Sequence, residues 1–497
     1  MAIPKEILEV KRPKNTVVFA YGKNKDKYGV RERLGCSREE GKKNPIPIEG
    51  KTIGHIVGMR FVPKEAAGKA AQPISASPYD VKDFANIVFL DGLFKGVLAD
   101  LGKHYNEADS RKLYCISLLR VAYPGIKDYE LKDAYDSSYL SNLYPGVGLS
   151  KNAVSAFIYN VGKTYSRVIS FMKDRVSGTA SDSRLLIDGT LKSNHSKVNT
   201  LSEFSRKAKL KGRKDISVLF CFDLTKMEPV CSKCYPGNMI DSTAYESFLE
   251  ENGITTGLII GDKAFTEEAA KKHFEGNDSL HHLNPLRRNS KYIGKYKMLE
   301  YQGALNSDDS VLYRKAKVEG EGKWLYSFRD SDQAVLEEKD FLKRMKRDEA
   351  GYTGEEYKRR RDSFGTIVFE CDLDWTPEEI YFAYSQRWTI EVVMRYYKHA
   401  LDINDTRVHE DLSVYGSEFI DFLACLLTFK ALNKFDREKL LSKMTYKQLM
   451  RQLEKGKKVG IGGNWEFVKL NPKTVKIYST LGIIEGQGKK SKEQSAV

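Results

Sequence analysis

The chain has 497 residues, of which 41% are hydrophobic and 30% are charged, and this composition excludes a wholly disordered protein. Its length exceeds what one hydrophobic core supports, so we expect about three domains. Lys and Arg number 82 against 67 Asp and Glu, and the resulting net charge of +15 favours a polyanionic partner such as nucleic acid without establishing one.

Neither membrane insertion nor secretion is indicated. The longest apolar stretch, residues 422–429, is far shorter than the roughly 20 residues of a membrane-spanning helix. The first residues also lack the apolar region of a signal peptide. We therefore expect a cytoplasmic protein without a membrane partner.

The seven cysteines are an odd number spread over a long chain, which is not the pattern of a disulfide framework. Cys231 and Cys234 form a CxxC pair, but no second such pair and no pair of histidines stands at zinc-binding spacing. The alternating residues around the pair predict a strand. We expect reduced thiols, with a zinc site as the minor interpretation.

The N-terminal part of the chain divides into two regions. Residues 1–65 are rich in Lys, Gly and β-forming residues and predict a small basic β-rich module. After an Ala/Pro/Ser-rich linker, residues 80–180 have helical periodicity and form a candidate DNA-binding region. Here Ser150 is a candidate N-cap for a helix with apolar residues at 154, 157, 158 and 161. This helix fits either a DNA-reading helix-turn-helix or the core of a helical bundle.

The pattern then becomes α/β. Residues 181–288 predict three antiparallel strands, a helix and further strands, which is the order of a ribonuclease-H-like sheet. Residues 289–364 depart from it and predict a mainly β insertion, and residues 365–430 complete the core with a strand and a helix. Residues 431–485 predict a C-terminal domain, and the polar tail 486–497 is expected to be disordered.

The helix in the second part of the predicted core has strong start signals. Thr376 is the expected N-cap, Pro377 the first helical residue, and Glu379 stands three positions after the cap, which is the arrangement of a capping box. We expect this helix to continue to about Leu401.

Two aspartates end apolar strand patterns. Asp188 follows Leu-Leu-Ile and Asp262 follows Leu-Ile-Ile, so each is expected where a buried strand reaches the surface. Each has an ordinary explanation when taken singly, because aspartate at the end of a strand is common in turns.

A polar stripe on the helix that begins at Pro377 changes this assessment. Tyr384, Arg387, Glu391 and Lys398 stand at offsets of 0, 3, 7 and 14 residues, and a helix places them within roughly 60° of arc. Their neighbours are apolar, so the stripe is expected to line a partly buried cleft. The alternative is an ion pair of Arg387 with Glu391 on a solvated face, which more polar neighbours would favour.

Three carboxylates and several cations suit metal-dependent chemistry on a phosphodiester. Two divalent ions ~3.5–4 Å apart need several carboxylate oxygens as ligands. The phosphate needs fixed donors, for which Arg offers a planar fork, Lys a point charge and Tyr a hydroxyl.

The stripe resembles the Tyr-(2)-Arg-(3)-Glu-(6)-Lys signature of bacterial insertion-sequence transposases of the DDE class, in the family named after insertion sequence four. Gly-Asp-Lys-Ala-Phe around Asp262 and Ile-Asp-Gly-Thr around Asp188 resemble the two aspartate motifs of that family. The two aspartates are 74 residues apart, and 129 residues separate Asp262 from Glu391. The long second interval leaves room for an insertion.

This resemblance implies a ribonuclease-H-like catalytic domain with an inserted β-domain, in a DNA transposase that excises an element and joins it to target DNA. Asp188, Asp262 and Glu391 would be catalytic and would bind two Mg²⁺ or Mn²⁺ ions, while Tyr384, Arg387 and Lys398 would contact phosphate near the transposon end. The implied partners are double-stranded DNA, as transposon ends and target, and a second copy of the chain in the DNA complex. The implied location is the bacterial cytoplasm, at the nucleoid.

Relatives with this signature cut the second strand through a DNA hairpin, in which a base leaves the stack. An aromatic surface can replace the lost stacking. Trp388, directly after Arg387, and Trp324, in the predicted insertion, are candidates for DNA contact. The alternative for both is a buried core aromatic.

Two other classes of protein stay open. A ribonuclease-H-like nuclease or resolvase would keep the three acids without needing the polar stripe. A non-catalytic, domesticated DNA-binding protein would keep the basic N-terminal region but tolerate loss of an acid.

Overall fold

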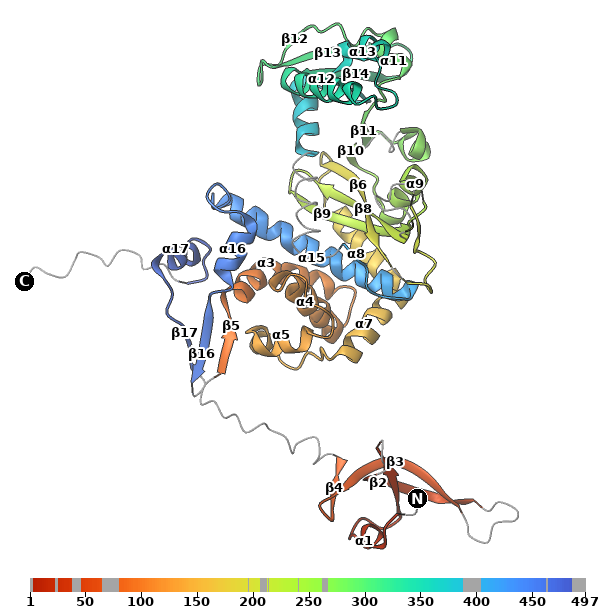
Figure 1. The fold of residues 1–497 in the computed structure, drawn as a ribbon, viewed down its shortest axis with the longest axis vertical. Coiled ribbons are helices and arrows are strands. Elements are labelled where there is room, and N and C mark those ends of the chain that lie inside the picture. Colours follow the sequence, from red (N-terminus) through yellow and green to blue (C-terminus); the bar gives the residue numbers. More distant parts are fainter. Residues whose placement is uncertain are drawn as a thin grey trace, which may run out of the picture. The chain divides into compact units, whose positions relative to one another are not determined.

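The computed structural model describes residues 3–22, 26–37, 46–64, 80–194, 196–205, 212, 214–239, 241–261, 267–387, 404–461 and 464–484. The chain forms two compact units, Met1–Asp80 and Val81–Val497 (Figure 1).

The first unit is a small antiparallel sheet with the strand order β1-β2-β3-β4. Its core contains four buried aliphatic residues, Val10, Val18, Val30 and Ile56. The elements are α1 (Lys5–Leu8), β1 (Thr16–Tyr21), β2 (Lys27–Ser37), β3 (Ile46–Val57) and β4 (Arg60–Pro63).

The second unit is built on a mixed sheet around β6 (Arg184–Ser193). On one side, β8 (Lys214–Asp223) is antiparallel to β6, and β9 (Glu228–Pro236) is antiparallel to β8. On the other side, β10 (Gly257–Ile260) is parallel to β6, and β11 (Leu280–Pro285) is parallel to β10. The order β9-β8-β6-β10-β11, with these directions, is the predicted ribonuclease-H-like arrangement.

Short elements complete this part of the unit. The direction of β10 requires a crossover after β9, and α9 supplies it. The remaining elements are β7 (Glu203–Phe204), α9 (Asp241–Asn252), η1 (Glu267–Ala270), α10 (Lys271–Phe274) and α11 (Lys291–Lys295).

The sheet continues beyond β11 into the segment expected to be an insertion. β15 (Thr366–Cys371) is antiparallel to β11, and β14 (Lys323–Asp330), β13 (Val311–Val318) and β12 (Gly303–Ala304) follow in that order. The hydrogen-bonded sheet is therefore continuous from the ribonuclease-H-like strands into this segment.

Residues 289–364 are mixed α/β, whereas the sequence pattern predicted mainly β structure. They include α12 (Ser331–Lys346), α13 (Gly354–Arg360) and the short η2 (Arg361–Ser363). Side-chain caps start both longer helices: the Asp330 carboxylate accepts from the Gln333 N–H, and the Thr353 hydroxyl accepts from the Glu356 N–H. These helices lie in a stretch that is rich in charged residues, so they bury few apolar side chains and resemble a loop by composition.

The helices before β6 pack around α15 (Asp411–Arg437), which crosses the unit (Figure 1). Val154, Phe157, Ile158 and Val161 of α7 are buried, and α7 packs closely against α15. The bundle-core interpretation of this apolar stripe is therefore confirmed, whereas DNA reading by the outer face of α7 stays a prediction. The helices are α3 (Ala85–Leu101), α4 (Glu107–Ala122), α5 (Leu131–Ser137), α6 (Leu140–Leu143), α7 (Lys151–Lys163) and α8 (Tyr165–Ser177).

Among the described residues, α15 is the one helix long and apolar enough to cross a membrane, and 83% of its most apolar window is buried inside the protein. Its apolar character is therefore used in packing against the surrounding helices and strands.

The C-terminal residues pack against the start of the helical region. β16 (Lys457–Ile461) lies between β17 (Asn464–Phe467) and β5 (Asp80–Asp83) in a small sheet. The carbonyl of Gly456 accepts from the N–H groups of Phe84 and Ala85, at 2.9 Å each. Two helices complete this region, α16 (Tyr446–Leu453) and α17 (Pro472–Thr480).

At the closest point between α7 and α15, the two helices meet at glycines and leave no space for a side chain. A Cβ added at Gly162 would lie 1.7 Å from the Leu412 carbonyl oxygen, and one added at Gly416 would lie 1.9 Å from the Ile158 carbonyl oxygen. Backbone atoms cannot move aside as a flexible side chain can, so both positions require glycine.

We predict that Gly162→Ala destabilises the protein by about 1–3 kcal/mol, because the two helices must separate to admit the methyl group. Urea unfolding of the full chain measures this loss. The matched control is Gly96→Ala on the exposed face of α3, where an added Cβ meets nothing within 4 Å. The control should be neutral or slightly stabilising, and equal losses in the two variants would contradict the packing argument.

Candidate active site

Asp188 lies within β6, not at the end of the strand as the sequence pattern suggested. β6 continues to Ser193 because residues 189–193 pair with β8, from Gly189 opposite Leu219 to Ser193 opposite Asp215. The Asp188 side chain is half-buried, and its Oδ1 accepts from the Gly189 N–H at 2.9 Å. The first predicted acid is thus held on the central strand of the sheet.

The second predicted acid, Asp262, lies outside the described residues, but the strand that leads to it is described. Leu258, Ile259 and Ile260 of β10 pair with residues 184, 185 and 186 of β6, a constant offset of 74 positions. This offset equals the separation of Asp188 and Asp262 in the sequence.

The predicted capping box is confirmed at the start of the helix that we call the Pro377 helix, described from Pro377 to Arg387. The Thr376 hydroxyl accepts from the Glu379 N–H at 3.3 Å, and Glu379 Oε2 accepts from the Thr376 N–H at 2.8 Å. The hydrogen bond from the Thr376 backbone, followed by that from its hydroxyl, lowers the pKa of Glu379. The part of the helix predicted beyond Arg387 lies outside the described residues.

Aromatic contacts fix the Pro377 helix on one face of the sheet. The ring centroids of Tyr384 and Phe369 of β15 are 4.4 Å apart, and those of Tyr381 and Phe328 of β14 are 5.2 Å apart. Residues directly opposite each other on paired strands share a face, and so do alternate residues along a strand.

Asp188 lies on the same face. A row of paired residues crosses the sheet from β15 to β6 through Cys371, Leu283, Ile260 and Leu186. Cys371 stands two residues after Phe369, and Leu186 stands two residues before Asp188, so both ends of the row share the face of these residues. The Pro377 helix and the Asp188 carboxylate therefore belong to the same side of the sheet.

Arg387 connects this helix to β10. Its side chain is buried, with a relative exposure of 9%, and its Nη1 donates to the carbonyl oxygen of Gly261 at 3.4 Å. Its guanidinium carbon is 5.8 Å from the centre of the Tyr384 ring. Arg387 thus contacts the residue that precedes Asp262, and Tyr384, a second member of the predicted stripe, lies beside Arg387. The other predicted residues of this helix, Trp388, Glu391 and Lys398, lie outside the described part of the chain.

Trp324 lies on the same sheet face but far from β6. It pairs with Cys371, and the cross-strand row continues through Leu283 and Ile260 to Leu186, four strand spacings or about 19 Å away. The indole is half-buried, with Lys315 Nζ 4.6 Å and Lys317 Nζ 5.4 Å from the ring centre.

Lys315 and Lys317 were not singled out in the sequence. They alternate along β13, and that two-residue spacing places both beside Trp324 on the neighbouring strand. Lys315 Nζ also donates to the Trp375 carbonyl at 2.7 Å, which ties β13 to the start of the Pro377 helix.

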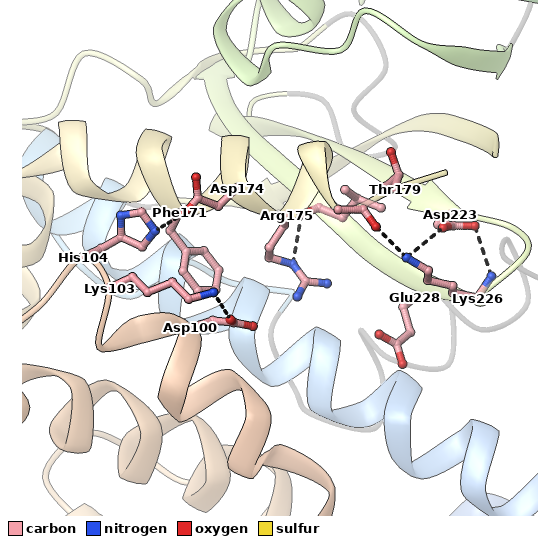
Figure 2. Close-up of a pocket in the computed structure, with 12 residues that line it drawn as sticks. Asp100, Lys103, His104, Phe171, Asp174, Arg175, Thr179, Asp223, Lys226 and Glu228 are labelled. Atoms are coloured by element: carbon pink, nitrogen blue, oxygen red, sulfur yellow. Dashed lines mark hydrogen bonds and ion pairs between the residues drawn. The ribbon is translucent and has the colours of Figure 1, made fainter. Parts of the chain in front are cut away.

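A cavity of about 310 Å³ borders the other end of β6, near the end of β8 at Asp223 (Figure 2). Its lining charges are already paired with neighbours: His104 Nε2 lies 2.9 Å from Asp174 Oδ2, and Lys103 Nζ lies 2.8 Å from Asp100 Oδ1. None of the predicted site residues lines it. Its mixture of paired acids and bases indicates no single class of ligand.

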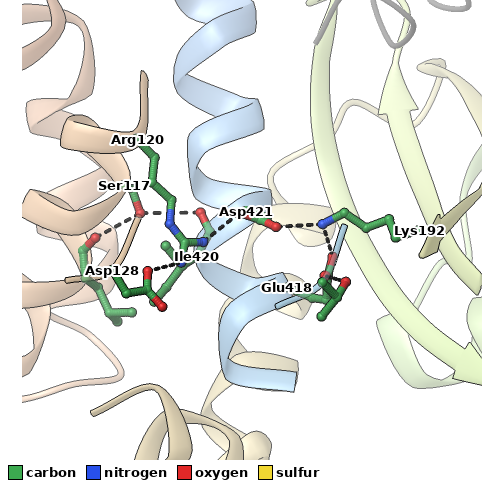
Figure 3. Close-up of polar contacts among 9 residues, drawn as sticks. Ser117, Arg120, Asp128, Lys192, Glu418, Ile420 and Asp421 are labelled. Atoms are coloured by element: carbon green, nitrogen blue, oxygen red, sulfur yellow. Dashed lines mark hydrogen bonds and ion pairs between the residues drawn. The ribbon is translucent and has the colours of Figure 1, made fainter. Parts of the chain in front are cut away.

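A buried ionic network begins at Lys192 (Figure 3). Lys192 stands four residues after Asp188 on β6 and therefore lies on the same face of the strand. Lys192 Nζ lies 2.6 Å from both Glu418 Oε2 and Asp421 Oδ2 of α15. Asp421 Oδ1 in turn lies 2.6 Å from Arg120 Nη1 of α4, and Arg120 Nη2 lies 3.1 Å from Asp128 Oδ1. The network joins the strand that holds Asp188 to the helical region.

The pKa values of the network follow from burial and pairing. Burial acts to lower the pKa of Lys192, but the Asp421 and Glu418 carboxylates outweigh it and raise the pKa. Burial raises the pKa of Glu418. Burial also acts to raise the pKa of Asp421, but Lys192 and Arg120 outweigh it and lower the pKa. The network was not predicted from the sequence. Glu418 and Asp421, two acids within the most apolar stretch of α15, could have indicated buried ion pairs.

The cysteines form no metal centre in the described part of the chain. Cys231 and Cys234 lie in β9, as the alternating pattern predicted, and both are buried and free. Burial raises the pKa of each thiol. No group of three or more potential metal ligands occurs among the described residues, a set that does not include Asp262 or Glu391.

Comparison with known families decides what this arrangement belongs to. Residues 179–416, just under half of the chain, match the family described as the transposase DDE domain. Over this segment the chain is similar to the transposase DDE domain, and we call residues 179–416 the DDE domain. The DDE domain begins directly before β6, ends within α15, and contains Asp188, Lys192, Asp262 and Glu391.

Two solved structures resemble the chain weakly. The cryo-EM structure of a piggyBac transposase synaptic complex with hairpin DNA has a TM-score of 0.40 at 11% identity, covering 74% of this chain and 79% of that one. A Mos1 transposase paired-end complex with the left transposon end has a TM-score of 0.14 at 12% identity, covering 31% and 58%. Both scores are below 0.5, so the assignment of the DDE domain rests on the family match. No curated protein matches the sequence.

We predict that Lys192→Met destabilises the protein by about 3–5 kcal/mol, because it leaves Glu418 and Asp421 buried without their shared cation. Urea unfolding measures the loss. The control is Lys132→Met, which breaks an exposed ion pair with Asp136 on α5 and should have little effect. A small effect of both substitutions would show that the network contributes nothing to stability.

Proposed function

We propose that this chain is a DNA transposase, which cuts DNA at the ends of a mobile element and joins the freed ends to target DNA. The contact of Arg387 with the Gly261 carbonyl carries this proposal. Gly261 directly precedes Asp262, and Arg387 stands four residues before Glu391. The contact therefore joins the immediate neighbourhoods of two predicted acids.

The pairing of β10 with β6 supports a position of Asp188 close to the other two acids. The offset of 74 between paired residues is also the separation of Asp188 and Asp262, so a parallel register continued by two residues would set these acids side by side. Four residues span one helical turn, about 6 Å of rise, from Arg387 to Glu391. We propose that the three carboxylates lie within about 8 Å of one another, a spacing that suits one two-ion site.

The donor set suits hard divalent cations. Asp188, Asp262 and Glu391 would supply carboxylate oxygens, which Mg²⁺ and Mn²⁺ prefer, and two such ions are proposed. When bound, the ions supply charge stabilisation for the attacking and leaving oxygens of the phosphodiester. The half-buried position of Asp188 on the central strand is compatible with this role, since the carboxylate is held by the sheet yet retains access to solvent.

The chain's own residues position the DNA and the acids. Arg387 is proposed as a positioning residue that holds the Pro377 helix to β10, because its buried guanidinium is bonded to a backbone carbonyl. Tyr384, Arg387 and Lys398 are proposed to face the phosphates near the cut, as the resemblance of the stripe implies. The DNA partners are proposed to be transposon ends and target DNA.

The finer assignments rest on the Tyr-Arg-Glu-Lys signature. We propose that the chain is a member of the bacterial family named after insertion sequence four, that it acts as a homodimer in the DNA complex, and that it works at the nucleoid in the cytoplasm.

We predict that Asp188→Asn abolishes cleavage at the transposon end while DNA binding stays within a few-fold, because binding depends mainly on phosphate contacts by Lys and Arg. The substrate is a labelled duplex of the sequence that borders the reading frame, incubated with Mg²⁺ or Mn²⁺. The control is Asp182→Asn, an exposed residue just before β6, which should cleave normally. Cleavage by Asp188→Asn at the unmodified rate would overturn the assignment of this residue.

Transfer of a pre-cut end into plasmid DNA separates the alternatives. A transposase joins the end, a nuclease or resolvase cuts without joining it, and a non-catalytic DNA-binding protein does neither. We expect joined product with the unmodified chain.

We further propose that the second strand is cut through a DNA hairpin and that Trp324 and Trp388 are DNA contacts that stack on an unpaired base. The half-exposed indole of Trp324, beside the exposed Lys317, supports a nucleic-acid contact, because aromatic surfaces bind bases and lysines bind the adjoining phosphates. Lys315, on the same strand, is already paired with Asp374.

We predict that Trp324→Ala or Trp388→Ala leaves the first nick nearly unchanged but slows hairpin formation about ten-fold, since stacking contributes ~1–3 kcal/mol per base. Denaturing gels would then show accumulated nicked ends. Trp465→Ala in β17, outside the DDE domain, serves as the control. Absence of any hairpin species with the unmodified chain would contradict the hairpin route but leave the transposase assignment intact.

A further inference from the structure

The first unit contains a two-stranded ribbon that extends beyond its core. The last pairing of β1 with β2 is Thr16 with Glu32, and the last pairing of β3 with β4 is Gly54 with Pro63. Beyond these points β2 and β3 pair as strands only with each other, through Ser37 opposite Ile46 (Figure 1), and the Arg33 N–H also donates to the Asn15 carbonyl at 2.8 Å. We call this segment, Arg33–Ser37 with Ile46–Lys51, the ribbon.

The ribbon has no hydrophobic core of its own. None of its described side chains is buried, and Leu34 and Ile48 are 70% and 48% exposed. Leu34 lies across Gly50, and Ile48 lies across Gly35. An isolated two-stranded hairpin is marginally stable in water, so the ribbon gains stability when a partner covers it.

The charge of the surrounding unit identifies the covering partner as a polyanion. Residues 1–64 contain 15 Lys and Arg against 7 Asp and Glu, so about one eighth of the chain carries +8 of its net charge of +15. On the ribbon itself, Arg33 and Lys51 are exposed. Such a concentration of charge attracts the phosphates of a nucleic acid.

The shape of the ribbon fits the major groove of DNA. This groove, about 12 Å wide, admits a two-stranded β-ribbon, and its floor presents hydrogen-bond acceptors for Arg and Lys and thymine methyl groups for apolar side chains. The pairing of β2 with β3 has register shifts between Val30 and Arg31, Arg31 and Arg33, and Arg33 and Gly35. Such bulges increase strand twist, which helps a ribbon follow a helical groove.

We infer that the ribbon inserts into the DNA major groove, with Arg33 and Lys51 contacting base edges and with Leu34 and Ile48 covered by the DNA. This inference rests on the proposed function for its partner, double-stranded DNA, but it assigns sequence reading to a surface separate from the DDE domain. The unit's other lysines supply the phosphate contacts that orient the ribbon.

Selection from a pool of random-sequence duplexes tests the inference with the full-length chain. The unmodified protein should select a sequence motif and be blocked by N7-methylation of guanines within it. Arg33→Ala with Lys51→Ala should weaken binding ~10-fold or more and change the selected bases. Leu34→Ser with Ile48→Ser should weaken binding of the motif without changing the dependence of affinity on salt, because no charge is removed.

The matched control removes two exposed lysines of the same unit outside the ribbon, Lys11→Ala with Lys14→Ala. It should weaken binding to every sequence equally and keep the selected motif. If the ribbon variants select the same motif with unchanged affinity, the inference is wrong. If the ribbon variants instead lose self-association measured without DNA, the ribbon is a protein interface and the inference is equally wrong.

A chemical probe inside the ribbon gives an independent readout. Cys36 is the one exposed residue among the seven cysteines, so alkylation of the native protein reports on it selectively. The selected duplex should slow Cys36 alkylation several-fold, whereas an unrelated duplex at the same concentration should slow it less. Equal alkylation rates with and without the selected duplex would overturn the inference.

The cleavage assay keeps the two proposals distinct. A protein that selects a motif through the ribbon but never cuts it would overturn the proposed function alone. A protein that cuts its ends while the ribbon variants select the same motif would overturn the inference alone.

Discussion

The second unit depends on charges buried between β6, α15 and α4. Removing Lys192, Glu418, Asp421 and Arg120 from water costs several kcal/mol per ion, and the short contacts among them offset that cost only in one geometry. An apolar contact at this place would tolerate sliding of α15 along the sheet, whereas the ion pairs accept one register. The strand that carries Asp188 is thereby set relative to the helices that precede it.

The close crossing of α7 and α15 also fixes the position of α15. Gly162 and Gly416 let the two backbones meet, so the helices are fixed where the glycines coincide. One helix, α15, therefore makes both the charged contact with β6, the strand that contains Asp188, and the tightest packing contact of the helical region. The DDE domain, which ends within α15, is completed by helices that come before it in the sequence.

The sequence predicted features that local chemistry determines. Thr376, Pro377 and Glu379 specify a helix start by themselves, and the structure has it at the expected residue. The buried character of β10 and the alternation of β9 likewise predicted strands. Tyr384 and Arg387 were expected on one helix face, and they lie beside each other, with Arg387 bonded to Gly261.

Features that depend on distant partners were not predictable in this way. The extent of β6 beyond Asp188 depends on pairing with β8, and the ion pairs of Lys192 join residues more than 220 positions apart. α12 and α13 were not predicted because they lie in a highly charged stretch, although their N-cap residues, Asp330 and Thr353, could be recognised in the sequence. Asp262, Trp388, Glu391 and Lys398 lie outside the described residues, and the proposed convergence of Asp262 and Glu391 with Asp188 is inferred from the register of β10 and the contact of Arg387.

The position of α15 late in the chain bears on how the protein is made. Arg120 meets Asp421 across 301 residues, so the helical region cannot acquire its core until the ribosome has passed residue 437. At a synthesis rate of about 5–20 residues per second, the earliest helices wait for tens of seconds with their apolar faces uncovered. A prematurely ended chain would keep those faces exposed and be open to proteolysis.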